Sequence, residues 1–294
     1  MTFTFKLARR TARFCPPVRG VARGALMLLA AAAAAGCNSD DSTAPVSPDQ
    51  TTEPTQIAPS SPELATTATQ VTISPGQSIQ AKVNSYPAGT QFLLKAGTYY
   101  SQRVVPKSGN AFIGEPGAIL DGKGGTRYAF ERGNSPYPNN VVIKGLIVQH
   151  YAPPEQQGAI LAGGPQPDQK TTGWVVQDCE VRYNATGGIR TGDKTKVIGN
   201  FVHHNGQLGI MGSGDSVLVQ NNEISYNNYQ NLYPFGVALG GGKFVNTRWL
   251  TVRGNKVHDN QGNGLWTDIG NRYALIENNV VDANSGAGIM HEIS

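Results

Sequence analysis

The sequence contains only three cysteines in 294 residues, Cys15, Cys37 and Cys179. So few thiols exclude a disulfide-dense scaffold, and no group of cysteine and histidine residues has the spacing of a zinc site. The sequence also lacks an apolar run long enough for a comfortable transmembrane helix. The fold must therefore be stabilised without cross-links, a structural zinc or a membrane span.

Positive charge is scarce after residue 36. The chain has a formal net charge of +4, but residues 1–36 carry six basic residues and no acidic one. Removing these six leaves 18 basic residues against 20 acidic ones, and no stretch of the remainder forms a basic stripe. We therefore expect no nucleic-acid partner.

Residues 1–36 have the pattern of an export signal, a basic start followed by the apolar run ALMLLAAAAAAG at 25–36. The AAGC ending resembles the lipobox of bacterial lipoproteins, with Ala34 where that motif usually has leucine. The resemblance implies that Cys37 carries lipid and becomes the mature N-terminus, with plain secretion as the alternative. Asn38 after the cysteine implies sorting to the outer membrane in a Gram-negative cell.

Residues 37–69 are rich in Ser, Thr and Pro and contain no aromatic residue. Five prolines oppose regular structure in this stretch, so it is interpreted as a disordered linker. Residues 70–294 are long enough to bury the core of one domain. We expect a monomer that meets the membrane only through the lipid anchor.

A unit of about 22 residues recurs six times after residue 140. Two columns of mostly asparagine appear when the units are aligned. The first contains Gly145, Cys179, Asn200, Asn222, Asn255 and Asn279, and the second contains His150, Asn184, Asn205, Asn227, Asn260 and Asn284. Valine or isoleucine lies three residues before the first column and two residues after it.

A unit of this length cannot bury its apolar side alone, so the units must stack. We expect an all-β right-handed parallel β-helix with stacked valines inside and asparagines at the turns, where their amides bond between coils. Cys179 is then a small buried filler. A leucine-rich horseshoe is excluded because its leucine frame is absent. The pattern resembles the right-handed β-helix repeats of the pectin-lyase-like superfamily, strongly over 140–294 and loosely over 70–139.

The two ends of the predicted β-helix differ. Residues 74–87 start with Ser74 and Pro75 and place Ile79, Val83 and Tyr86 on one helical face, which predicts a short helix that caps the first coil. The other end, GIMHEIS, stops within a strand without a cap. We therefore expect the sequence to be truncated at its C-terminus.

Alternation of inward and outward side chains predicts which residues face solvent on the third strand of each unit. The outward columns contain Arg190, Met211, Ala238, Trp266 and Met290, and then Gly192, Ser213, Gly240, Asp268 and Glu292. Asp268 and Glu292 should lie on adjacent coils about 5 Å apart, beside Trp266. Arg190 is a candidate substrate-binding residue in the same column as Trp266.

Several chemistries fit the two carboxylates. Asp268 and Glu292 could bind Ca²⁺, act as an acid/base pair at a glycosidic bond, or bond sugar hydroxyls while Trp266 stacks on a ring. The alternative is a solvated pair that keeps the strand soluble. The alternation of inward and outward side chains points His291 inward, as a core residue. A local bulge would turn it outward, where it could act as a general base.

Two sets of inserted residues, the first around 151–172 and the second at 228–235 and 241–247, should form loops on one side of the β-helix. The second contains Tyr229, Tyr233, Phe235 and Lys243. These residues could wall a groove above Trp266. Tyr229, Tyr233 and Trp266 would then bind substrate, and Lys243 or Tyr229 would act as a base. The alternative is that the loops only cover the sheet.

The resemblance to the superfamily implies a polysaccharide as partner, but no residue list. WVVQDC at 174–179 departs from the Trp-Ile-Asp-His stretch of pectate lyases, and the motifs of polygalacturonases and mannuronan epimerases are absent. We expect a lyase that cleaves an acidic polysaccharide with Asp268 and Glu292 on Ca²⁺. The alternatives are a carbohydrate-binding or adhesin-like surface protein, or a glycoside hydrolase or epimerase.

Overall fold

The computed structural model describes residues 69–164, 169, 171–234 and 237–293. The predicted signal peptide, Cys37, all of the linker except its last residue, and Phe235 lie outside the described residues. Those predictions are untested.

The strands of the described residues form three sheets of nine, eight and seven strands. Sheet A contains β1 (Gln70–Ile73), β2 (Gln91–Leu94), β4 (Ala111–Gly114), β7 (Val142–Lys144), β10 (Val175–Gln177), β13 (Lys196–Ile198), β16 (Leu218–Gln220), β19 (Thr251–Arg253) and β22 (Leu275–Glu277). Sheet B contains β3 (Gly97–Tyr100), β5 (Ala118–Asp121), β8 (Ile147–Gln149), β11 (Glu180–Arg182), β14 (Phe201–His203), β17 (Glu223–Ser225), β20 (Lys256–His258) and β23 (Val280–Asp282). Sheet C contains β6 (Phe130–Glu131), β9 (Gly158–Leu161), β12 (Gly187–Thr191), β15 (Leu208–Asp215), β18 (Gly240–Arg248), β21 (Asn263–Asp268) and β24 (Ile289–His291).

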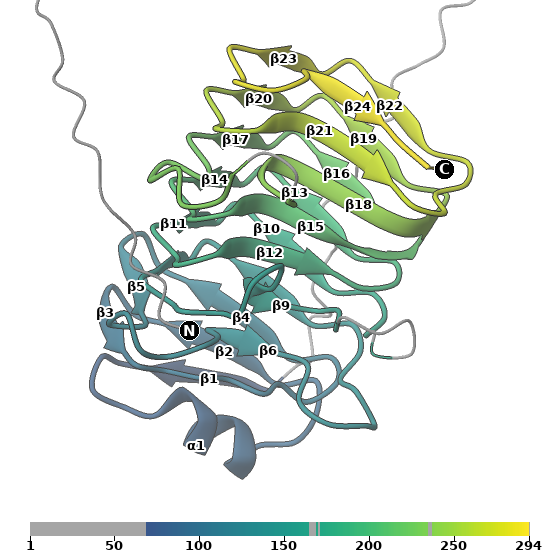
Figure 1. The fold of residues 1–294 in the computed structure, drawn as a ribbon. Helices are drawn as coiled ribbons and strands as arrows, with labels where there is room; N and C mark the ends of the chain where they lie inside the picture. The colour runs from purple at the N-terminus through teal and green to yellow at the C-terminus, as the bar shows by residue number, and fades with distance from the viewer. Residues whose placement is uncertain (1–68, 165–168, 170, 235–236, 294) are drawn as a thin grey trace, which may run out of the picture. The chain divides into compact units, whose positions relative to one another are not determined.

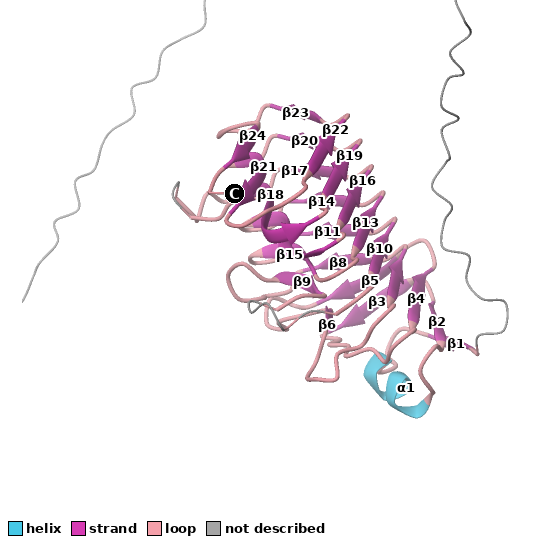
Figure 2. Ribbon diagram, turned by 90° about the vertical axis from the view of Figure 1, so that its right-hand side faces the viewer, coloured by secondary structure: helices cyan, strands magenta, loops and turns pink. Residues whose placement is uncertain are grey.

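Successive coils take one strand from each sheet and stack on the coil before them (Figures 1 and 2). Neighbouring strands of a sheet are parallel, as in the pairs β13–β16 and β16–β19. The architecture is therefore a right-handed parallel β-helix, as the repeats predict. Each coil pairs with the next through its backbone, which satisfies the strand N–H and C=O groups.

The interior is built from stacked aliphatic columns. Val197, Val219 and Val252 lie in register on sheet A, and all three are fully buried. In the first coils the columns contain phenylalanines instead: the ring centroids of Phe92 and Phe112 are 5.3 Å apart. The predicted inward positions are confirmed.

Helix α1 (Ile79–Ser85) lies beside β1 at the N-terminal end of the coils (Figure 1). Ile79 and Val83 are buried against the core, so the helix caps this end as expected. The helix starts later than the sequence suggested, because Ser78 is the N-cap and accepts a bond of 3.1 Å from the Ala81 N–H. No helix in the described part of the chain is long and apolar enough to cross a membrane.

The asparagines form two continuous ladders along the turns. The Nδ2 of Asn200 donates to the Oδ1 of Asn222 at 2.9 Å, and the pattern repeats from coil to coil in both columns. Register places Leu146 and Tyr151, rather than Gly145 and His150, at the heads of the columns, because Ile147 pairs with Glu180. The residue before each asparagine, and not the asparagine itself, takes positive φ.

Candidate functional site

The outward face of sheet C differs from the predicted column at one position, which a lysine occupies. Register aligns Arg190, Met211, Lys243, Trp266 and Met290, so Lys243 takes the place assigned to Ala238. Gly241 occupies the glycine position of the repeat, because its neighbours Gly240 and Gly242 pair with Leu208 and Ile210. The segment 241–247 is therefore part of β18 and not a loop insertion.

Lys243, Trp266, Asp268 and Glu292 line one cavity of about 420 Å³ at the outward face of β18, β21 and β24. The Nζ atom of Lys243 lies 2.9 Å from Oδ2 of Asp268 and 3.6 Å from the ring centroid of Trp266. Glu292 lies on the next coil, where its N–H donates to the Thr267 carbonyl at 2.8 Å. We call this cavity the Lys243 cleft.

The Lys243–Asp268 ion pair is largely removed from water. The side chains are 14% and 9% exposed, and the lysine lies over the indole face of Trp266. A cation on an aromatic face is attracted by the ring, and more strongly when it is desolvated. The cleft therefore holds a fixed positive charge beside two acidic residues and an aromatic surface.

The residues of this cleft do not fit calcium. Ca²⁺ takes six to eight oxygen ligands, whereas the Asp268 carboxylate is paired with Lys243. No group of three or more His, Cys, Asp or Glu side chains gathers for a metal within the described residues. Calcium binding by Asp268 and Glu292 stays an untested prediction.

His291 lies on the inward side of its strand, but its side chain is exposed and it is not a core residue. It pairs with Thr267 across β21 and β24, and its Nδ1 lies 2.7 Å from the Thr267 hydroxyl. It does not line the Lys243 cleft. The role of general base assigned to an outward His291 has no support in this geometry.

Arg190 is covered by loops. It is 8% exposed, and its guanidinium donates to the carbonyls of Gln156 and Gly164. With Gln156, Met211 and Lys243 it lines a small cavity of about 50 Å³ that continues the column toward Lys243. Arg190 is therefore a buried cation beneath the loops rather than an exposed contact.

The insertion after β17 covers a different edge than expected. The Tyr229 ring lies 6.0 Å from Tyr183 and 5.5 Å from His204, at the turn between sheets B and C. The Tyr233 N–H donates to the Asn228 side chain at 3.3 Å, and neither tyrosine lines the Lys243 cleft. These two tyrosines therefore do not wall the cleft as predicted, and Tyr229 lies instead against Tyr183 and His204. Val237 and Leu239, between the two inserted segments, line the cleft instead.

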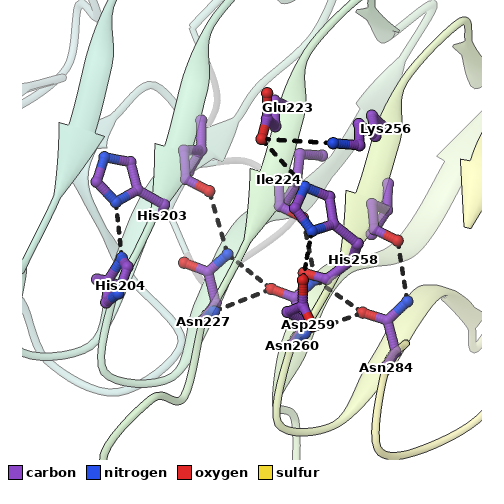
Figure 3. A network of polar contacts seen from close by, with 12 residues as sticks. His203, His204, Glu223, Ile224, Asn227, Lys256, His258, Asp259, Asn260 and Asn284 are labelled. Atoms are coloured by element: carbon purple, nitrogen blue, oxygen red, sulfur yellow. Dashed lines mark hydrogen bonds and ion pairs between the residues drawn. The ribbon is translucent and has the colours of Figure 1, made fainter. Parts of the chain in front are cut away.

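Two histidines of sheet B, His203 and His258, are buried and bonded (Figure 3). His203 Nε2 lies 3.1 Å from Glu180, and its Nδ1 lies 2.8 Å from Nδ1 of His204. His258 bridges Glu223 and Asp259 at 3.0 and 2.7 Å. Burial lowers the pKa of His203, and burial with the nearby His203 lowers the pKa of His204.

Arginines at the other end of sheet C form a cluster that the sequence did not predict. Arg103, Arg127 and Arg132 line a cavity of about 530 Å³ together with Glu131 and Gln157. These arginines are spread over the loops of neighbouring coils, so no linear stretch is basic. Arg127 and Arg132 flank β6 of sheet C, and Arg103 lies between β3 and β4, in coils where the sequence repeat is too weak to align.

Comparison with known proteins agrees with the fold. A family model described as a right handed beta helix region matches residues 168–294. No curated protein matches. Among solved structures, the A-module of the mannuronan C-5 epimerase AlgE4 from Azotobacter vinelandii is 13% identical, with a TM-score of 0.33, and the alignment covers 74% of this chain and 94% of that chain. This likeness is too distant to carry an argument about activity. The fold and the matching family model define a right-handed parallel β-helix protein.

Proposed function

We propose that this protein cleaves an acidic polysaccharide by β-elimination in the Lys243 cleft. The observation that carries the proposal is the position of the Lys243 ammonium, held between Asp268 and the Trp266 ring in a cavity that Glu292 also lines. This arrangement supplies a fixed cation in place of the calcium that the sequence suggested.

Lys243 would neutralise the carboxylate of a uronate ring. An ammonium has three N–H donors, and one of them is used by Asp268. Another can bond the substrate carboxylate, which gains charge when the adjacent C5–H bond breaks. Trp266 would offer an apolar surface to a neighbouring sugar.

Glu292 would accept the proton. In the proposed step the C5–H bond breaks and the proton moves to the Glu292 carboxylate. The electron pair forms the C4–C5 double bond, the bond from C4 to the glycosidic oxygen breaks, and that oxygen takes a proton from solvent. Asp268 positions Lys243 and does not contact the reacting atoms.

The experiment is a panel of uronate-containing and neutral polysaccharides incubated with the full chain. We expect ultraviolet absorbance from unsaturated sugar ends on at least one uronate polymer. Lys243→Met and Glu292→Gln should each lower the rate at least about a hundredfold. The matched controls Lys196→Met and Glu277→Gln change residues of sheet A and should keep the wild-type rate. Full activity of K243M or E292Q, with thermal unfolding unchanged, would disprove the proposed roles.

Hydrolysis is the second candidate, because Asp268 and Glu292 line the same cleft. A pair of carboxylates can act as acid and base at a glycosidic bond. Hydrolysis would release reducing ends without unsaturated ends. A polysaccharide that is retained but not cleaved would indicate a binding protein instead.

The place of action is proposed from the sequence. The lipobox-like AAGC at residues 34–37 supports a lipoprotein on the bacterial surface, with the linker holding the β-helix away from the membrane.

A further inference from the structure

We infer that the cavity lined by Arg103, Arg127 and Arg132, the arginine cavity, is an anion subsite that binds acidic groups of the same polysaccharide. The choice of ligand rests on the proposed function. The presence of an anion site rests on the arginine cavity itself.

The arginine cavity has more positive than negative charge. Three arginines and one acidic residue, Glu131, line it. Arg103 bonds Glu131, and that acid is largely buried. Arg127 forms no hydrogen bond or ion pair within the described residues. One guanidinium is thus balanced, and the other two have no acidic partner among the described residues.

Arg132 is held in place by uncharged partners. Its guanidinium donates to the Gly133 carbonyl at 3.2 Å and to Oε1 of Gln169 at 3.0 Å, and it lies 4.7 Å from the Tyr137 ring centroid. Its Nε is buried without a hydrogen-bond partner. A buried N–H of a charged group without an acceptor is costly. A bound oxyanion would remove that cost.

Arg190 adds a buried cation near the half-buried Arg132. The Nε of Arg190 is also buried without a partner, and no acidic residue pairs with Arg190 among the described residues. Burial and the nearby charge of Arg132 lower the pKa of Arg190. Two close guanidiniums without an acid between them favour an anion.

The arginine cavity lies in line with the Lys243 cleft. Leu161 of β9 lines the arginine cavity and pairs with Arg190 of β12, and Arg190 shares a small cavity with Lys243 of β18. Sheet C runs from β6 through β9, β12 and β15 to β18 (Figure 1). Four strand spacings of about 4.8 Å give roughly 19 Å between the ends of this path. A polysaccharide laid along the stack could contact both sites.

The ligand class follows from the guanidinium. Its planar fork matches the two oxygens of a carboxylate and also those of a sulfate. A neutral sugar offers only hydroxyls, which gain less from an arginine. We therefore expect the subsite to select polysaccharides by their negative charge.

The test is calorimetric binding of oligogalacturonate, oligomannuronate, a sulfated oligosaccharide and a neutral xylo-oligosaccharide to the full chain. We expect a uronate oligosaccharide to bind, with affinity that falls as salt is added. The double variant Arg127→Gln/Arg132→Gln should weaken this binding at least about tenfold. Arg253→Gln on sheet A removes one charge elsewhere and should bind like the wild type.

The outcomes separate this inference from the proposed function. Loss of uronate binding in the double variant, in a protein that cleaves nothing, supports the subsite and rejects the lyase. Cleavage of uronate polymers with unchanged affinity in the double variant overturns the subsite and keeps the lyase. Preference for the sulfated probe would assign the subsite to sulfate groups, and equal binding of the neutral oligosaccharide would overturn it. Thermal unfolding of the variant shows that it is folded.

Discussion

The residues that turn the chain from sheet B to sheet C adopt a backbone that such residues rarely take. Tyr183, His204 and Tyr226 have φ of 51°, 52° and 54°. The left-handed region costs a non-glycine residue roughly 1–2 kcal/mol. The asparagine that follows each one bonds between coils, and the rings stack, with 5.0 Å between His204 and Tyr226. These contacts offset the strain, so the turns depend on the asparagines.

Replacing Asn227 with alanine should therefore cost much stability. Asn227 accepts from the backbone and side chain of Asn205 and donates to Asn260 and Val202. Its loss leaves several buried groups unpaired, at about 1–3 kcal/mol each. We expect a loss of at least about 3 kcal/mol in the free energy of unfolding by denaturant. Asn284→Ala, at the exposed end of the ladder, should cost less, and an equal cost would contradict this account.

The pair His203 and His204 should make the protein acid-sensitive. Both pKa values lie below the ordinary value of about 6.5, because burial favours the neutral imidazole. As pH falls below about 6.5, the unfolded chain takes up protons that the folded chain resists, so stability decreases until the folded pKa values are passed. Thermal unfolding between pH 7 and pH 5 should show this decrease. His203→Gln/His204→Gln should flatten it, and an unchanged pH dependence would rule out this source.

Some of these residues could be placed from the sequence and others could not. Asp268, Glu292 and Trp266 lie on one face because alternation fixes the outward side of a strand. Lys243 was assigned to a loop, since the run LGGGK offers several glycines and its register is decided by pairing with β15 and β21. Its contact with Asp268 depends on that register. Periodicity alone could not predict it.

At the scale of elements, the first ladder begins at Asn200, and Cys179 holds the column position one coil before it. Its backbone N–H bonds Oδ1 of Asn200 as an asparagine would, and its Sγ lies 3.6 Å from the Ile143 carbonyl. Burial raises the pKa of the thiol to about 12. The cysteine therefore acts as a filler of the column, as the sequence predicted.

Cys179→Asn should extend the ladder by one coil. The new amide can donate to Asn200 and to the Ile143 carbonyl, as Asn200 does to Asn222 and Val176. We expect unfolding stability to stay level or to rise by up to about 1 kcal/mol. Cys179→Leu is the apolar control and should destabilise the protein. A loss of more than about 1 kcal/mol in C179N would contradict the equivalence of the column positions.

The elements themselves followed from the repeats after residue 140, where each coil carries both asparagine columns. The first coils could be placed only loosely, because their turns contain glycines and charged residues instead. The start of α1 was also misplaced, since Ser78 rather than Ser74 lies where the helix can pack Ile79 on the core. The sequence pattern favoured Ser74 and Pro75 as the start, whereas tertiary contact places the N-cap at Ser78.

At the scale of the whole molecule, the net charge counted from the sequence does not show where charged residues gather in the fold. The part after residue 36 is slightly acidic, yet arginines from separate coils gather in one cavity. Stacking brings together residues more than 20 positions apart, such as Arg103 and Glu131. Such a cluster cannot be detected from runs of charged residues in the sequence, because its members lie on different coils.

The proposed anchor gives a prediction for the complete chain. Cys37→Ser should leave an unprocessed precursor or a soluble product, because lipid can no longer be attached. Cell fractionation and the mass of the mature N-terminus measure this. A C37S protein that is cleaved normally and stays in the membrane would show that Cys37 is not the anchor.

The central claim is elimination in the Lys243 cleft, and the mass of the products tests it most directly. The wild-type protein should convert a uronate oligosaccharide into fragments whose new non-reducing ends are lighter, by one water molecule, than hydrolysis would give. Lys243→Met should produce none of them, while Lys196→Met produces them normally. Fragments that carry the full added water, or unsaturated fragments from K243M at the wild-type rate, would contradict the account.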